Sequence, residues 1–244
     1  IQSHSLIKSI DPSAEVLGIS TSGIDLKFIQ HMMDLGTPFD VLTIHPYRRI
    51  LNDRDFIADL KEASDLVQNA DGTKRPVWLT EMGWATFTPH NALRQDFIPT
   101  SQRKQAELIA RSYLCAIVSG VDPKTFWYNF RNDGEDPVYF EHNMGIMTRD
   151  FCPKPAYIAF AVLAQVLQGA TLDSPLPLED GTLAYRFTRG DTEEILVLWN
   201  FEQDATVTVP VPASTAQRIN AMGESQSVAC QDGALSLPLR EGSP

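Results

Sequence analysis

The chain has 244 residues and a mass of 27.2 kDa, a length that fits one large domain or two smaller ones. Apolar residues make up 43% and charged residues 21%, a balance that excludes disordered, collagen-like and coiled-coil proteins. The net charge of −11 repels a phosphate backbone, so no nucleic-acid partner is expected, whereas a neutral sugar is not repelled. No apolar run approaches the roughly 20 residues that span a bilayer, and the first ten residues lack a signal-peptide core.

Cysteine and histidine show none of the spacings that bind metals. Cys115, Cys152 and Cys230 are far apart and are expected to be packing residues. The five histidines form no HExxH or paired pattern, and the sequence has no G-x-G-x-x-G, Walker loop or G-x-S-x-G. We therefore expect no metal and no cofactor, and neither a serine hydrolase nor a nucleotide-binding protein.

Apolar strand-like runs alternate with helical periodicity over residues 1–170. This order predicts an α/β domain with parallel strands and right-handed helical crossovers. We expect strands at 15–20, 39–45, 76–80 and 125–130, and helices at 25–35, 56–70, 100–120 and 155–169.

The remaining residues, 171–244, have a different period. Short runs of alternating apolar residues are separated by turns that contain Asp and Gly, a pattern typical of a small all-β sandwich. Pro175 and Pro177 make 172–178 look like the linker between the two domains. The predicted strands of this module are 182–188, 194–201, 205–211 and 234–239.

Polar and aromatic side chains follow three of the strands in the first domain. His45 and Tyr47 stand at and just after the end of one strand, Glu81 follows the next, and the third strand contributes Trp127 and Asn129. Parallel α/β folds form their sites at the carboxyl ends of strands, so we expect these side chains to lie close together.

Glu81 ends an apolar strand, where a purely structural role would favour Val, Ile or Leu. A buried carboxylate needs hydrogen-bond partners, and Tyr47 and His45 are placed to provide them. The alternative is a structural Glu81 that caps the following helix or pairs with Arg48. Trp84 and Trp127 similarly fit either core packing or stacking on the apolar face of a sugar ring.

These residues together resemble the retaining glycoside hydrolases of clan A that are built on a (β/α)8 barrel, especially the family 39-like and family 5-like members with a β-sandwich after the barrel. The likeness spans most of the chain and rests on five motifs: His45–Tyr47 (HPY), Trp78–Trp84 (WLTEMGW), Phe126–Tyr128 (FWY), Gly145–Asp150 (GIMTRD) and Pro153–Tyr157 (PKPAY).

The resemblance implies a role for each matched residue. Glu81 would be the catalytic nucleophile at the end of the seventh barrel strand, with Tyr47 orienting it and His45 beside it on the sixth. Trp127 would form the floor of the sugar site, and Trp84, Asn129 and Arg48 would be further substrate contacts. The substrate would be an oligo- or polysaccharide, cleaved with retention by two carboxyl groups.

The second carboxyl group of this clan is a Glu that follows an Asn on the fourth strand, and the chain contains no Asn-Glu dipeptide. Because the first strand here resembles the fifth, we expect the chain to be the second half of a TIM barrel, strands 5–8, with the acid/base upstream. The missing half, a second copy or the chain's own loops would then cover the open sheet, and the fragment alone would be inactive or weakly active. An enzyme that cuts polysaccharides is expected to be secreted or periplasmic. The alternative from another class is a carbohydrate-binding or scaffolding fragment with an incomplete site.

Overall fold

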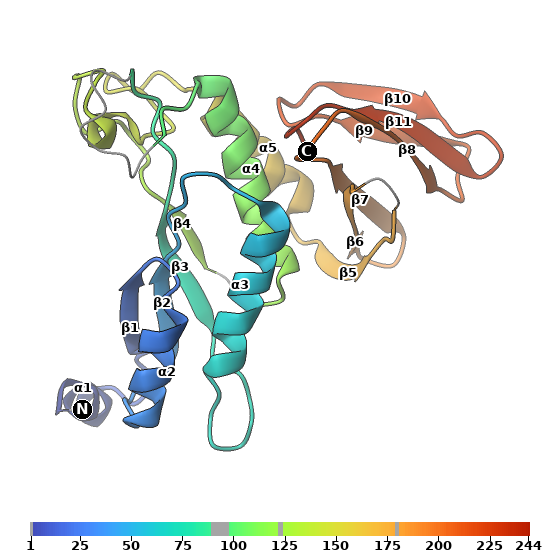
Figure 1. The fold of residues 1–244 in the computed structure, drawn as a ribbon. Helices are drawn as coiled ribbons and strands as arrows, with labels where there is room; N and C mark the ends of the chain where they lie inside the picture. Colours follow the sequence, from blue (N-terminus) through green and yellow to red (C-terminus); the bar gives the residue numbers. More distant parts are fainter. Residues whose placement is uncertain (1, 89–97, 122–123, 179–180) are drawn as a thin grey trace. The chain divides into compact units, whose positions relative to one another are not determined.

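The computed structural model describes residues 2–88, 98–121, 124–178 and 181–244 (Figure 1). Within these ranges, no helix is both long enough and apolar enough to cross a membrane. The elements are, in chain order, α1 (Gln2–Ile10), β1 (Leu17–Ser22), α2 (Leu26–Asp34), β2 (Val41–His45), α3 (Asp53–Leu66), β3 (Val77–Met82), α4 (Gln102–Val118), β4 (Thr125–Trp127), the 3-10 helix η1 (Phe140–Asn143), α5 (Pro155–Leu167), β5 (Thr171–Pro175), β6 (Leu183–Arg189), β7 (Glu193–Trp199), β8 (Ala205–Pro210), β9 (Thr215–Ile219), β10 (Ser225–Ala229) and β11 (Ala234–Leu239).

The described chain forms two compact units. The first contains the residues up to Gly83 together with Tyr113–Asn129, and it holds β1 to β4. The second contains Pro99–Ser112 and Phe130–Pro244, together with the segment that begins at Trp84. The predicted domain boundary at residue 170 remains a prediction, because the two compact units divide the chain at other positions.

The first unit is built on a four-stranded sheet in the order β1-β2-β3-β4, in which every neighbouring pair is parallel. Helices α2 and α3 connect its first three strands (Figure 1), as parallel pairing requires. In the middle of the sheet, Ile44 on β2 pairs with Leu79 on β3, and both side chains are fully buried. The alternation of strands and helices predicted from the sequence is confirmed, and the fold is α/β.

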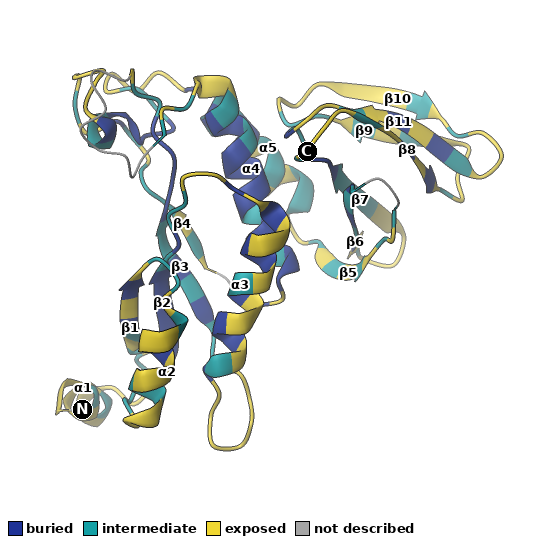
Figure 2. Ribbon diagram, viewed as in Figure 1, coloured by how far each residue is buried: buried dark blue, intermediate teal, exposed yellow. Residues whose placement is uncertain are grey.

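Local sequence explains where the helices begin. The Asp25 carboxylate accepts a hydrogen bond from the Phe28 amide at the start of α2, and the Asn52 side chain caps α3 in the same way. Pro155 occupies the first turn of α5, where its missing N–H is not needed. In α3, the buried side chains of Phe56 and Leu60 recur at helical spacing and give the helix one buried face (Figure 2).

The second unit ends in three small antiparallel sheets, with strand orders β5-β6-β7, β11-β8 and β10-β9. Val207 and Val209 of β8 and Leu235 and Leu237 of β11 form a buried cluster. Apolar residues of β7, β9 and β10 pack against this cluster. The strands therefore share an apolar core, as the alternating pattern predicts.

The segment predicted as a linker, 172–178, is in large part a strand. Thr171–Pro175 forms β5, which pairs with β6 through Leu172 opposite Phe187 and Pro175 opposite Tyr185. The prediction was wrong because β5 is an edge strand, where a proline at the end of the strand is tolerated. Strands β9 and β10 were also not predicted from the sequence.

Candidate active site

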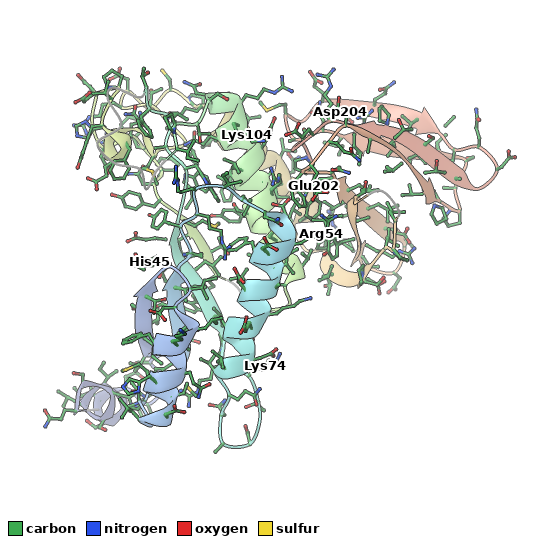
Figure 3. All side chains as sticks on the ribbon, viewed as in Figure 1. His45, Arg54, Lys74, Lys104, Glu202 and Asp204 are labelled. Atoms are coloured by element: carbon green, nitrogen blue, oxygen red, sulfur yellow. The ribbon has the colours of Figure 1, made fainter. Side chains whose placement is uncertain are left out.

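Three adjacent parallel strands of the first unit bring the predicted residues to one edge of the sheet. His45, labelled in Figure 3, is the last residue of β2. Glu81 is the penultimate residue of β3, and Trp127 is the last residue of β4. Because the strands run in the same direction, their carboxyl ends lie at the same edge.

The Glu81 carboxylate has two partners, both of which the sequence predicts. The Tyr47 hydroxyl donates a hydrogen bond to Oε2 of Glu81 at 3.1 Å. Nδ1 of His45 lies 3.5 Å from the same oxygen. Within the described part of the chain, no hydrogen bond reaches the other oxygen, Oε1, and the Glu81 side chain is 40% exposed. One carboxylate oxygen is therefore held, while the other is open to a ligand.

An irregularity in β3 explains how Glu81 reaches this position. The pairing of β3 with β4 shifts register between Leu79 and Met82. Thr80 and Glu81 are consequently both half-buried, although neighbouring residues of a regular strand alternate between its two faces. Such bulges re-aim a side chain at the edge of a sheet, and here the re-aimed side chain is the carboxylate.

The backbone around His45 is also fixed. Its carbonyl oxygen accepts hydrogen bonds from the amides of Gly23 and Tyr47, each at 2.7 Å. These bonds tie the end of β2 to the segment after β1 and shape the tight turn that carries Tyr47. The phenol is thereby presented toward Glu81 from a short, anchored segment.

Trp127 and Asn129 lie next to this pair along the sheet edge. Trp127 pairs with Met82 across β3 and β4, and both Trp127 and Asn129 are half-buried. The Tyr128 amide, between them, donates to the Met82 carbonyl at 2.8 Å. The predicted indole and amide are therefore held within one strand spacing of the strand that carries Glu81.

Arg48 and Trp84 have surroundings that suit structural roles. The Arg48 guanidinium pairs with Asp59 of α3 at 2.6 Å and stacks on the Phe56 ring at 4.8 Å. Arg48 is therefore not the partner of Glu81, and the alternative in which Glu81 pairs with Arg48 is excluded. Trp84, in the second unit, is only 3% exposed.

The second unit contains a buried polar cluster that the sequence did not reveal. Nζ of Lys154, a residue only 3% exposed, donates to Asn132 Oδ1 at 2.8 Å, Thr86 Oγ1 at 3.0 Å and the Asn143 carbonyl at 3.3 Å. The side chain of buried Gln105 donates a hydrogen bond to the Trp84 carbonyl, two residues before Thr86, at 2.8 Å. The cluster therefore joins the segment after β3 to the loop after β4. The members of this cluster are far apart in the chain. The sequence motifs included Lys154, in the Pro153-Lys154-Pro155 string, but none of its partners.

We expect Lys154 to give the stability of the protein a distinct pH dependence. Burial lowers the pKa of its ammonium group from 10.5 to about 8. Between these values the unfolded chain binds more protons than the folded one, so the contribution of Lys154 to the free energy of unfolding rises with pH by up to about 3 kcal/mol. Unfolding by urea at pH 7, 8, 9 and 10 should show this rise in the wild type but not in Lys154→Met.

Lys104→Met removes a partly exposed lysine of the same unit and serves as the control. Its unfolding curve should keep the wild-type rise. The account of Lys154 is contradicted if Lys154→Met and the wild type differ by the same free energy at all four pH values.

The Tyr47 hydroxyl gives a second testable contact. If Glu81 is the nucleophile that the resemblance implies, Tyr47→Phe should lower kcat/KM of the completed barrel about 10- to 100-fold, because a hydrogen bond to a charged group contributes about 1.5–3 kcal/mol. Tyr139→Phe is the matched control, since its hydroxyl donates to Glu141 at 2.5 Å at an exposed position. Equal rates for Tyr47→Phe and the wild type would contradict the role of Tyr47 in holding Glu81.

No group of three or more His, Cys, Asp or Glu side chains that could hold a metal ion occurs among the residues that the structure describes. The arrangement around Glu81 consists of a carboxylate, a phenol, an imidazole and an indole. In this arrangement the Glu81 carboxylate can act as an oriented nucleophile or base beside an aromatic surface.

Proteins that are similar to this chain are found among solved structures. No protein-family model matches the chain, and no curated protein matches it. Among solved structures, the chain is similar to a family 39 glycoside hydrolase from the gut symbiont Bacteroides cellulosilyticus WH2. The TM-score is 0.78 and the identity 26%, covering 97% of this chain and 51% of that one.

Two further structures share the fold at 16% identity. The family 39 enzyme from Xanthomonas axonopodis pv. citri has a TM-score of 0.53, covering 98% of this chain and 60% of its own. The family 39 β-xylosidase from Caulobacter crescentus has a TM-score of 0.52, covering 98% and 58%. The chain thus spans between half and three fifths of the length of these proteins. The resemblance seen in the sequence motifs is confirmed: over nearly its whole length, the chain is similar in structure to parts of clan A glycoside hydrolases, among them members of family 39.

Proposed function

We propose that the chain is the second half of a retaining (β/α)8-barrel glycosidase, with β1 to β4 as barrel strands 5–8 and a small β-sandwich after them. The observation that carries the proposal is the Glu81 carboxylate, held at Oε2 by Tyr47 and His45 while Oε1 remains open. The parallel strand order and the similarity to family 39 structures support it. The substrate class is an oligo- or polysaccharide.

In this proposal Glu81 is the nucleophile of a double displacement. Its open oxygen bonds to the anomeric carbon as the glycosidic C–O bond breaks, and a second carboxyl group protonates the leaving oxygen. That second group then takes a proton from water, whose oxygen displaces Glu81 and releases the sugar with its original configuration. The Tyr47 hydroxyl keeps Oε2 occupied, so that Oε1 faces the reaction.

The aromatic residue beside Glu81 along the sheet would form the sugar site. We assign Trp127 to its floor and Asn129 to its lining, because both stand on or directly after the strand that neighbours β3. Trp84 and Arg48 receive no support as substrate contacts, since Trp84 is buried and Arg48 is paired with Asp59.

The second carboxyl group and the rest of the barrel are proposed to come from outside this sequence. Among the described strands, β1 and β4 are the two edges of the parallel sheet. Leu17 on β1 is 41% exposed and Phe126 on β4 is 49% exposed, which favours a protein surface that covers them. That cover would be the first half of the barrel, as a separate or continuous polypeptide, or a second copy of this chain. Because the substrate would be a polysaccharide, we also propose that the protein acts outside the cytoplasm.

The test is the native mass of the purified protein, with denaturing mass spectrometry and glycosidase assays on the same sample. A co-purifying polypeptide of about barrel-half size should accompany activity on phenyl glycosides. The 27.2 kDa chain alone should be about 10²- to 10⁴-fold less active on such unactivated leaving groups, because it lacks the general acid. Enzyme-like rates from the chain alone would contradict the proposal.

A further inference from the structure

Strand β1 contains a β-bulge with a strained backbone. Gly18 of β1 pairs with Leu42 of β2. The next pair after the irregularity is Thr21 with Ile44, so β1 advances by three residues where β2 advances by two. Within the bulge, Ile19 has a φ of 57°, in the left-handed region, where a β-branched residue is an outlier. The strain therefore lies just before the carboxyl end of β1, toward the edge of the sheet that carries the candidate site.

The bulge determines which side chains of β1 share a face of the sheet with His45. In an unbroken register Thr21 would pair with His45, but in the structure Ser22 does. Paired positions of neighbouring strands point to the same face, and a shift of one residue exchanges the two faces. Thr21 is consequently buried together with Ile44, whereas Ser20 and Ser22 are exposed, as the alternating burial along β1 shows (Figure 2). The strained backbone thus turns two hydroxyl groups toward the face of His45.

The two serines at the end of β1 differ in their hydrogen bonds. The Ser20 hydroxyl lies 2.7 Å from Thr43 Oγ1, so these two hydroxyl groups bond to each other. Within the part of the chain that the structure describes, no group hydrogen-bonds to the Ser22 hydroxyl. The backbone beside Ser22 is fixed, because the Gly23 amide donates to the His45 carbonyl at 2.7 Å. The Ser22 hydroxyl is therefore held in place while its bonding capacity remains available, and little ordering is needed when a ligand binds.

Ser22 and Glu81 stand two strands apart at the same edge of one sheet. Strand β2, which carries His45, lies between their strands. Neighbouring strands are about 4.8 Å apart, so roughly 10 Å separates the backbone at Ser22 from β3. This span exceeds the width of one sugar ring. A sugar attacked by Glu81 would therefore present its neighbour in the glycan, rather than itself, to Ser22.

We propose that the Ser22 hydroxyl binds a hydroxyl group of the sugar unit next to the one that Glu81 attacks, so that the site favours an oligosaccharide over a single sugar. This inference rests on the proposed glycosidase function. A serine hydroxyl both donates and accepts hydrogen bonds, as a sugar hydroxyl does, so the two groups match in either direction. The strain at Ile19 then has a functional explanation, because the bulge that contains it brings Ser22 to the face of His45.

The test is titration of this chain, followed by NMR chemical shifts, with four neutral trisaccharides and the corresponding single sugars. The trisaccharides are xylotriose, cellotriose, mannotriose and β-1,4-galactotriose. At least one of them should bind about threefold or more tightly than its single sugar. Ser22→Ala should weaken binding of that trisaccharide about 2- to 10-fold, the effect of one lost neutral hydrogen bond, and should leave the affinity for the single sugar unchanged.

Two further variants separate recognition from folding. Ser22→Thr keeps a hydroxyl group and should retain most of the trisaccharide affinity, whereas Ser5→Ala removes an exposed serine of α1 and should change nothing. The Tm of each variant should match that of the wild type. The inference is overturned if no trisaccharide is preferred by the wild type, or if Ser22→Ala binds the preferred one as the wild type does. It is also overturned if Ser22→Ala weakens trisaccharide and single sugar equally. Covalent labelling of Glu81 by a glycosidase inactivator would still support the proposed function in those cases, so the two can fail separately.

Discussion

Glu81→Gln is expected to reduce turnover by the catalytically complete enzyme on the order of 10⁴-fold or more, because the amide cannot form the glycosyl–enzyme bond. The substitution keeps the size of the side chain and its position at the end of β3. Tyr47 can still donate to the amide oxygen, so folding should change little. The readout is kcat on an aryl glycoside, with Tm measured on the same preparations.

Two comparisons make this expectation specific to a nucleophile. Glu141→Gln changes another carboxylate that accepts a hydrogen bond from a tyrosine, and it should leave the rate unchanged. Azide added to Glu81→Ala should restore turnover and yield a glycosyl azide of inverted configuration, because the anion enters from the side that the carboxylate occupied. Turnover by Glu81→Gln within about tenfold of the wild type would exclude Glu81 as nucleophile. If the complete protein binds sugar but shows no turnover, and Glu81→Gln leaves its affinity unchanged, the carbohydrate-binding alternative is favoured.

Gly145→Ala is expected to be strongly destabilising, although it lies outside the site. An added Cβ would lie 2.2 Å from the Asn132 amide nitrogen, 2.4 Å from the Arg131 carbonyl carbon and 2.7 Å from the Met147 carbonyl oxygen. All three are backbone atoms, so no side chain can turn aside to make room. We expect a loss of about 4 kcal/mol or more in the free energy of unfolding, or failure to accumulate as soluble protein.

Gly169→Ala is the matched control for this change. Gly169 has a φ of 70°, and an added Cβ would meet nothing within 4 Å. Alanine there pays only the conformational penalty of the left-handed region, about 1–2 kcal/mol. Similar unfolding free energies for the two variants would contradict the close approach of backbone around Gly145.

Local signals in the sequence were enough to predict the alternating strands and helices before residue 170. Strand-length apolar runs and apolar residues at helical spacing, such as Ile57 and Leu60 in α3, each act within a few residues. The segment that forms β5 was misjudged because its proline, Pro175, is tolerated only at a sheet edge, and edge position depends on tertiary pairing. Strands β9 and β10 were missed because their polar sequences lack an apolar alternation.

The site was predictable to the extent that it depends on strand ends. Tyr47 and Glu81 are 34 positions apart, yet adjacent parallel strands place them within hydrogen-bond distance, as expected. The partner of Arg48 was not predictable, because it lies on a helix face whose rotation only packing decides. The Lys154 cluster depends on loops that meet in three dimensions, and no local spacing encodes it.

The measurement that tests the central claim most directly is mass spectrometry after incubation with 2-deoxy-2-fluoro glycosides that carry activated leaving groups. Such compounds trap a glycosyl–enzyme and do not depend on the general acid. The account predicts one added fluoroglycosyl group, located on Glu81 in the peptide map and absent in Glu81→Gln. Attachment to another residue, or the same labelling of Glu81→Gln, would contradict it.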